Sequence, residues 1–128
     1  MINFYSKIFD DINYLLGQTD LIALEKIAKS LISANKKNKK VIIFGNGGSA
    51  AISSHVSVDL TKNAGIRSIN FNEADLLTCF SNDYGYEKVF SKSLEFYADK
   101  GDIVIIISAS GRSKNLLEAA KICKKKKI

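Results

Sequence analysis

The chain contains no proline, only two cysteines and a single histidine among its 128 residues. Without proline, no proline-marked linker or domain boundary can be traced along it. Cys79 and Cys123 lack the paired spacing of a metal site, which predicts buried or free thiols. A chain of this length is expected to form one domain with a sizeable core.

Long hydrophobic segments are also missing. No apolar run approaches the roughly 20 residues that a membrane helix needs, and residues 1–7 lack the pattern of a signal peptide. We therefore expect a cytoplasmic protein. Eight of the 19 basic residues lie in two lysine runs, at 36–40 and 124–127, which are expected to be solvated helix ends. No arginine-rich stripe with interleaved aromatics is present, so no nucleic-acid partner is predicted.

The chain is organised around a glycine-rich turn that follows an apolar run. Residues 41–44 show no polar alternation, which predicts a strand buried on both faces of a parallel sheet. Gly45, Gly47 and Gly48 then let the backbone turn sharply and approach a ligand closely. Ser49 is a preferred N-cap type for the helix expected next. Free N–H groups and the positive end of the helix dipole would together favour a phosphate.

The same turn allows a second interpretation. Gly45, Gly47 and Ala50 match a loose form of the dinucleotide-binding fingerprint. That fingerprint also expects an acidic residue about 20 positions later, at the end of the second strand. The next strand candidate, 66–71, is followed by Asn72 and Glu73, so the first acidic residue, Glu73, comes later than the fingerprint expects. The glycine turn alone leaves both interpretations open.

Apolar periodicity predicts the remaining elements. Helices are expected at 2–16, from a cap at Asp20 to about 35, at 50–62, at 73–80, around 89–97 and from 114, with strands at 66–70 and 103–108 and a polar turn at 81–86. Residues 1–38 would be a helical segment and 39–128 an α/β core. The apolar faces of the first two helices could lie on the sheet or on another subunit.

The helix at 50–62 carries the only histidine. Ile52, Val56 and Leu60 are predicted to form its buried stripe. His55 and Asp59 lie four residues apart and so share a different face. They could be a hydrogen-bonded pair that merely holds the helix, or an acid/base group or metal ligand near the glycine turn.

A second polar loop follows the apolar run 103–107, which is predicted to be a third buried strand. Ser108, Ser110 and Ser113 offer hydroxyls beside main-chain N–H groups, which suits the oxygens of a phosphate monoester. One such loop could be only a serine-rich turn with an N-cap. Two loops that each end a buried strand favour a sugar-phosphate site, because open parallel sheets bind ligands at this edge.

Three ordered motifs carry a resemblance to a known family. They are Phe44 to Ser49 with His55, Asn82-Asp83-x-Gly85-Tyr86, and Ile107-Ser108-x-Ser110-Gly111-x-Ser113-x-Asn115. Together they resemble the sugar isomerase (SIS) domain family, specifically its phosphoheptose isomerase branch. The resemblance implies a three-layer α/β fold with a parallel sheet, and usually a tetramer. It also displaces the dinucleotide interpretation.

By this resemblance, the protein would interconvert sedoheptulose 7-phosphate and D-glycero-D-manno-heptose 7-phosphate for lipopolysaccharide or capsule synthesis. His55 and Asp59 would be catalytic and would bind one zinc ion. The chemistry needs a base and a means of stabilising an enediolate, which a carboxylate and zinc can supply. The substrate-binding residues would be Asn46, Gly47, Gly48, Ser49, Asp59, Asn82, Asp83, Ser108, Ala109, Ser110 and Ser113.

Two features depart from the branch. Asp59 stands where the branch commonly has a glutamate, and a misplacement of one ångström can cost about a hundredfold in rate. The family also continues for two more strands and a helix, with a glutamine and a second histidine that serve as zinc ligands. We therefore expect a truncated chain with an exposed edge at the strand 103–108. The alternative function is a non-catalytic phosphosugar-binding module that regulates a partner such as a replication initiator.

Overall fold

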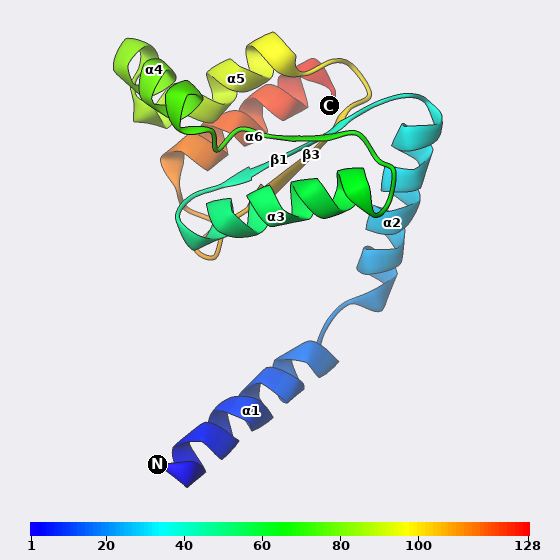
Figure 1. Ribbon diagram of the computed structural model, residues 1–128, viewed down its shortest axis with the longest axis vertical. Helices are drawn as coiled ribbons and strands as arrows, with labels where there is room; N and C mark the ends of the chain where they lie inside the picture. The colour runs from blue at the N-terminus through cyan, green and yellow to red at the C-terminus, as the bar shows by residue number, and fades with distance from the viewer. The chain divides into compact units, whose positions relative to one another are not determined.

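The structure is a computed structural model that describes residues 1–128. The chain forms two compact units, residues 1–30 and 31–128. No helix combines the length and apolar character needed to cross a membrane. The elements are α1 (Ile2–Gly17), α2 (Leu21–Lys36), β1 (Val41–Gly45), α3 (Gly48–Lys62), β2 (Ser68–Asn70), α4 (Ala74–Tyr84), the 3-10 helix η1 (Tyr86–Lys88), α5 (Val89–Tyr97), β3 (Ile103–Ile107) and α6 (Lys114–Lys126) (Figure 1).

The first unit holds α1 and the start of α2, close to where the sequence predicts them. Gly17 is the last residue of α1. The Ala23 N–H donates to Asp20 Oδ1 over 3.0 Å, which confirms the predicted cap of α2. Large apolar side chains on α1, such as Phe4 and Phe9, are exposed. Two short helices by themselves have no core in which to bury them.

The second unit is built on a parallel sheet with strand order β2-β1-β3. Every residue of the central strand β1 is buried, as predicted. The prediction that β3 is fully buried is wrong, because all five of its residues are only half-buried. A strand at the edge of a sheet has a neighbour on one side only. β2 is shorter than predicted, with three residues.

Helices cover both faces of this sheet, which confirms the three-layer α/β prediction. α3 lies on one face, and α5 and α6 lie on the other (Figure 1). Because side chains alternate along a strand, Phe44 of β1 points into the layer that α5 and α6 cover. Its ring stacks on Phe90 of α5 at 4.5 Å between centroids and on Phe71 at 5.7 Å. This cluster, with Leu94 and Leu116, is the hydrophobic core.

The face of α3 that packs on the sheet differs from the prediction. Ser53 and Ser57 are the buried residues of this helix, whereas Ile52 is 53% exposed. Val56 and Leu60 are half-buried. The Ser53 hydroxyl donates to the Ser49 carbonyl over 2.7 Å, so it is satisfied without a partner in the sheet. Small side chains with internal hydrogen bonds let α3 lie close to β1, and apolarity alone misidentifies the contact face.

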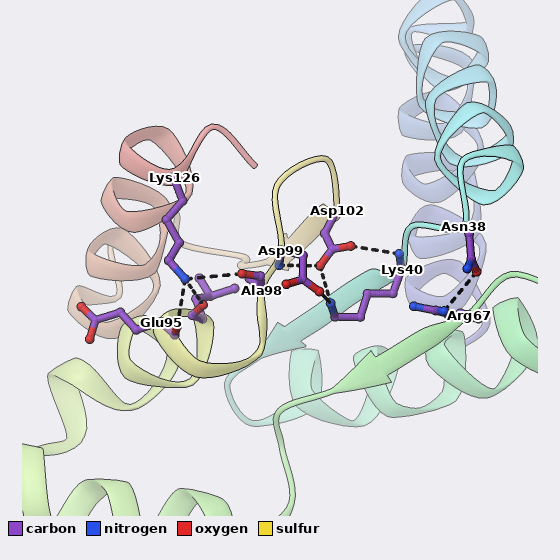
Figure 2. Close-up of polar contacts among 9 residues, drawn as sticks. Asn38, Lys40, Arg67, Glu95, Ala98, Asp99, Asp102 and Lys126 are labelled. Atoms are coloured by element: carbon purple, nitrogen blue, oxygen red, sulfur yellow. Dashed lines mark hydrogen bonds and ion pairs between the residues drawn. The ribbon is translucent and has the colours of Figure 1, made fainter.

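A buried ion pair ties the starts of β1 and β3 together (Figure 2). Asp102, 4% exposed, accepts from the Lys40 ammonium, from the Lys40 N–H at 3.1 Å and from the Asp99 N–H at 2.8 Å. Lys40 Nζ also lies 2.8 Å from Asp99 Oδ2, and only 14% of the Lys40 side chain is exposed. The prediction that this lysine belongs to a solvated helix end is therefore wrong.

The second lysine run also contributes to the fold. Lys124, Lys125 and Lys126 form the last turn of α6, where positive charge is favourable, as predicted. Lys126 departs from a purely solvated role, because its ammonium donates to three carbonyls at the end of α5 (Figure 2). The distances are 3.0 Å to Leu94, 2.9 Å to Glu95 and 3.4 Å to Ala98. The α6 lysine thus satisfies acceptors that a helix leaves unpaired.

Candidate functional site

The glycine turn at the end of β1 has the predicted sharp geometry but a different cap. Gly47, not Ser49, is the N-cap of α3, and its φ of 55° lies in the left-handed region that favours glycine. The helix therefore starts at Gly48, and Ser49 lies inside its first turn. A Cβ on Gly45 would lie 2.7 Å from the Ser49 Cβ and 2.8 Å from the Ile107 carbonyl oxygen. Glycine at 45 lets β1, α3 and β3 converge.

Two asparagines hold this turn from the side of β2. The Asn72 amide donates to the Gly45 carbonyl over 2.8 Å, and the Gly45 N–H donates back to Asn72 Oδ1 over 3.3 Å. The Asn70 amide donates to the Ile43 carbonyl over 3.1 Å. These two side chains hydrogen-bond to the backbone of β1 beyond the point where β2 ends, in place of the backbone of a longer strand. Asn72 was not predicted to have this role, and no local pattern in the sequence marks it.

The serine loop between β3 and α6 is shaped by its own hydroxyls. Ser108 Oγ accepts from the Gly111 N–H over 3.0 Å, and Ser110 Oγ accepts from the Arg112 N–H over 3.2 Å. Gly111 has a φ of 62°. Ser113 is the N-cap of α6, but its side chain makes no capping hydrogen bond. All three hydroxyl protons are therefore available to donate to a ligand.

The glycine turn and the serine loop enclose one polar cavity of about 190 Å³. At about 30 Å³ per water, that volume accommodates a phosphate group. Its position at the carboxyl ends of two neighbouring parallel strands is where such sheets bind ligands. The lining residues are Asn46, Ser49, Ile107, Ser108, Ala109, Ser110, Ser113 and Leu116. Six of the predicted substrate-binding residues are thus brought together.

Asn46 is held by two residues that the predicted site did not include. Its Nδ2 donates to Asn115 Oδ1 over 2.9 Å, and its Oδ1 accepts from Asn115 Nδ2 over 2.9 Å. The same Oδ1 accepts from the Tyr86 hydroxyl over 3.0 Å. Both partners belong to the motifs quoted above, and this membership is the only sign in the sequence that they have a role. Their contact with Asn46 is visible only in the folded chain.

His55 and Asp59 lie farther along α3. His55 Nε2 is 3.4 Å from Asp59 Oδ2, with the side chains 79% and 48% exposed, and Asp59 Oδ1 accepts from the Asn63 amide over 3.0 Å. The predicted shared face is confirmed. Neither residue lines the cavity, and His55 stands about 9 Å along the helix axis from Ser49 at 1.5 Å per residue.

The residues described do not by themselves fit a zinc site. Zinc sites in proteins use three or four protein ligands, and no group of three or more His, Cys, Asp and Glu side chains occurs in the structure. His55 and Asp59 are two ligand types at close range. A zinc ion bound there would need at least one further ligand besides these two side chains.

Asn82 and Asp83 occupy the last turn of α4, which ends at Gly85. The predicted polar turn at 81–86 is wrong over 81–84, because the helix continues until Gly85, with a φ of 83°, terminates it. Asn82 donates to Asp83 Oδ1 over 3.0 Å, and the Cys79 thiol lies 3.8 Å from Asp83 Oδ2. Neither residue lines the cavity.

A model of the SIS domain family matches residues 5–128. The chain belongs to the SIS domain family. This SIS domain is 40% identical over 121 residues to phosphoheptose isomerase 2 of Campylobacter jejuni, an alignment that covers 89% of this chain and 60% of that relative. It is 42% identical over 108 residues to phosphoheptose isomerase of Helicobacter hepaticus, covering 80% of this chain and 55% of the relative. The chain thus spans about 60% of the length of the first of these curated relatives.

Solved structures agree on the fold. The phosphoheptose isomerase GmhA from Neisseria gonorrhoeae superposes on 98% of this SIS domain and 71% of its own chain, with a TM-score of 0.88 at 27% identity. A phosphoheptose isomerase from Francisella tularensis gives a TM-score of 0.88 at 24% identity, over 98% of this chain and 69% of its own. In this SIS domain, asparagine side chains follow β2 where a dinucleotide fold expects an acid.

Proposed function

We propose that this SIS domain belongs to an aldose–ketose isomerase that acts on a seven-carbon sugar phosphate, sedoheptulose 7-phosphate. One observation carries the proposal: two loops at the ends of β1 and β3 enclose a polar cavity with serine hydroxyls and the N-terminus of α6 around it. Such an arrangement favours a phosphate monoester. The names of the relatives supply isomerisation of a phosphoheptose, and the family resemblance supplies sedoheptulose 7-phosphate as the ketose.

The reaction would proceed without any net oxidation. A base removes a proton from C1 of the ketose, and the electron pair moves towards the C2 carbonyl oxygen to give an enediolate. A proton then returns to C2 while O1 loses its own, so that the carbonyl ends at C1. We assign the base to Asp59 and proton exchange with the oxygens to His55, since these two side chains lie side by side on α3.

The remaining substrate assignments follow the cavity. Ser108, Ser110 and Ser113 would hold the phosphate with the backbone of Ala109, and Asn46 and Ser49 would contact the sugar next to it. Gly47 and Gly48 would contribute backbone N–H groups. Asn82 and Asp83 stay assigned to the sugar hydroxyls on the strength of the resemblance alone.

The test is to incubate the purified chain with sedoheptulose 7-phosphate, with and without added zinc, and to follow aldose formation. Binding is measured in parallel by calorimetry, with Ser110→Ala and the exposed Ser54→Ala as a matched pair. We expect Ser110→Ala to weaken binding about tenfold, a loss of about 1.4 kcal/mol, and Ser54→Ala to leave it unchanged. Equal affinities for the two variants would refute the phosphate assignment.

A zinc ion, a cytoplasmic location, a homotetramer and a role in lipopolysaccharide or capsule heptose synthesis are part of the same proposal. The apolar side chains of α1, which its own unit leaves exposed, support an assembly of copies. Light scattering after size exclusion would measure the mass of that assembly. A monomer at micromolar concentration would contradict it.

The second candidate is a non-catalytic module that binds a phosphosugar and regulates a protein partner. It is favoured by the position of His55 and Asp59, which are exposed, paired with each other and outside the cavity lining. A rise in melting temperature with sedoheptulose 7-phosphate, but no turnover under any metal condition, would select this candidate over the isomerase.

A further inference from the structure

Three separate elements meet at the side chain of one cavity residue, Asn46. The residue follows β1, Asn115 lies in the first turn of α6, and Tyr86 begins η1. Asn46 Oδ1 accepts two hydrogen bonds, from Asn115 Nδ2 at 2.9 Å and the Tyr86 hydroxyl at 3.0 Å. Asn46 Nδ2 donates one hydrogen bond, to Asn115 Oδ1 at 2.9 Å. An amide has two N–H groups, so one N–H of Asn46 stays free.

The orientation of this amide pair is set by the backbone of α6. Asn115 is 3% exposed, and its Oδ1 also accepts from the Leu116 N–H over 3.0 Å. The Leu116 N–H, which also donates to the Ser113 carbonyl over 3.1 Å, favours the oxygen at that end of the Asn115 amide, and the reciprocal pair then favours the matching orientation of Asn46. A flipped Asn46 amide would turn its N–H groups towards the Asn115 N–H donor and its oxygen towards Asn115 Oδ1, which leaves both contacts of the pair without a hydrogen bond.

We propose that Asn115 and Tyr86 are positioning residues for Asn46. They lock its amide so that the group facing a ligand in the cavity is a donor, and Asn46 therefore recognises an acceptor oxygen. The proposal rests on the proposed function for the identity of the ligand, a sugar phosphate, but not for the hydrogen-bond geometry.

This arrangement also links the two ends of the cavity. Asn115 lies two residues after Ser113, which is the N-cap of α6 and lines the cavity. The same turn of α6 holds Asn46 at the glycine loop. The start of α6 therefore carries both Ser113, which would contact the phosphate, and Asn115, which orients the Asn46 N–H. The sugar next to the phosphate would then meet an N–H donor that already points in one direction.

The first test reads the amide directly by NMR and needs no ligand. In the full chain, Tyr86→Phe removes one hydroxyl, and Tyr84→Phe is the matched control because the Tyr84 hydroxyl makes no contact with Asn46. We expect Tyr86→Phe and Asn115→Ala to shift the Asn46 side-chain NH₂ resonances, and Tyr84→Phe to leave them in place. Unshifted resonances in Tyr86→Phe would overturn the proposal. Tyr86 is 55% exposed, so this variant is expected to fold.

The second test measures binding as a double-mutant cycle. Asn115→Ala should weaken sedoheptulose 7-phosphate binding about tenfold in the wild-type background, and less than about twofold in an Asn46→Ala background, because contacting residues are not additive. Inorganic phosphate carries no sugar for Asn46 to contact, so the wild type and Asn115→Ala should bind it with affinities within about twofold of each other. Independent tenfold losses in both backgrounds would mean that Asn115 acts by general structure and would refute the positioning role.

The two hypotheses fail in different ways. If the wild-type chain binds no sugar phosphate but the NMR shifts behave as expected, the proposed function fails and the positioning geometry stands. If the sugar phosphate binds and the cycle is additive, the proposed function stands and Asn115 is not a positioning residue.

Discussion

The buried ion pair at the start of the sheet offers the sharpest prediction on stability. Asp102→Ala removes the carboxylate that accepts from the Lys40 ammonium and from the backbone N–H groups of Lys40 and Asp99. The matched change is Asp99→Ala, which removes a carboxylate from the same lysine. The side chain of Asp99 is 76% exposed, whereas that of Asp102 is 1% exposed. Both variants remove one negative charge beside Lys40, so a difference between their free energies of unfolding reports the effect of burial.

The expected magnitudes differ several-fold. Removing one partner of a buried ion pair costs about 3–5 kcal/mol, because the other charge and its donors stay behind unpaired. The two backbone N–H groups that lose the carboxylate are among those donors, so we expect a loss for Asp102→Ala near the top of that range, about 5 kcal/mol. An exposed pair contributes about 1 kcal/mol or less. Asp99→Ala should therefore cost little.

The assay is urea unfolding at pH 7 and 25 °C, followed by circular dichroism. A loss for Asp102→Ala no larger than that for Asp99→Ala would refute the reasoning. If Asp102→Ala does not fold, Asp102→Asn is measured instead. It keeps the shape and one acceptor, and should cost less than the alanine change but more than Asp99→Ala.

The same pair predicts a pH dependence. Burial opposes ionisation of Asp102, but hydrogen bonds from Lys40 and the Asp99 N–H outweigh it, so the pKa of this carboxyl is lowered. The stabilisation is therefore complete above the ordinary aspartate pKa of about 3.9 and is lost as the pH falls through the lowered value. The free energy of unfolding of the wild type should fall more steeply below pH 4 than that of Asp102→Asn. Parallel profiles would contradict the assignment.

Three further predictions concern single residues. Gly45→Ala should destabilise by about 1–3 kcal/mol through overpacking, since its Cβ would meet the Ser49 Cβ and the Ile107 carbonyl; an unchanged urea midpoint would contradict this. Lys126→Gln should lower stability by about 1 kcal/mol or more, because the ammonium satisfies three carbonyls, whereas the exposed Lys125→Gln should not. Iodoacetamide should label the exposed Cys79 first, since Cys123 is half-buried and burial raises its pKa; mass spectrometry of the tryptic peptides gives the order.

Much of the fold follows from local patterns in the sequence. The apolar runs 41–44 and 103–107 mark parallel strands because no polar residue interrupts them, and the 3.6-residue period marks the helices. The serine loop and the glycine turn were predicted as one site, since the carboxyl ends of neighbouring parallel strands lie at one edge. Each element is read from residues close in sequence, and the rule for parallel sheets then brings the two distant loops together.

Other features depend on contacts between distant residues, and only the tertiary structure decided them. No local pattern shows that Lys40 is buried against Asp102, that Asn72 pairs with the backbone of Gly45, or that α3 packs through Ser53. The Asn46–Asn115 amide pair joins residues 69 positions apart. The physical reason is the same in each case. A polar group forms a hydrogen bond with whichever donor or acceptor the folded chain places within reach. Sequence periodicity predicts which side of a helix or strand is apolar, but it does not predict which donor will face which acceptor.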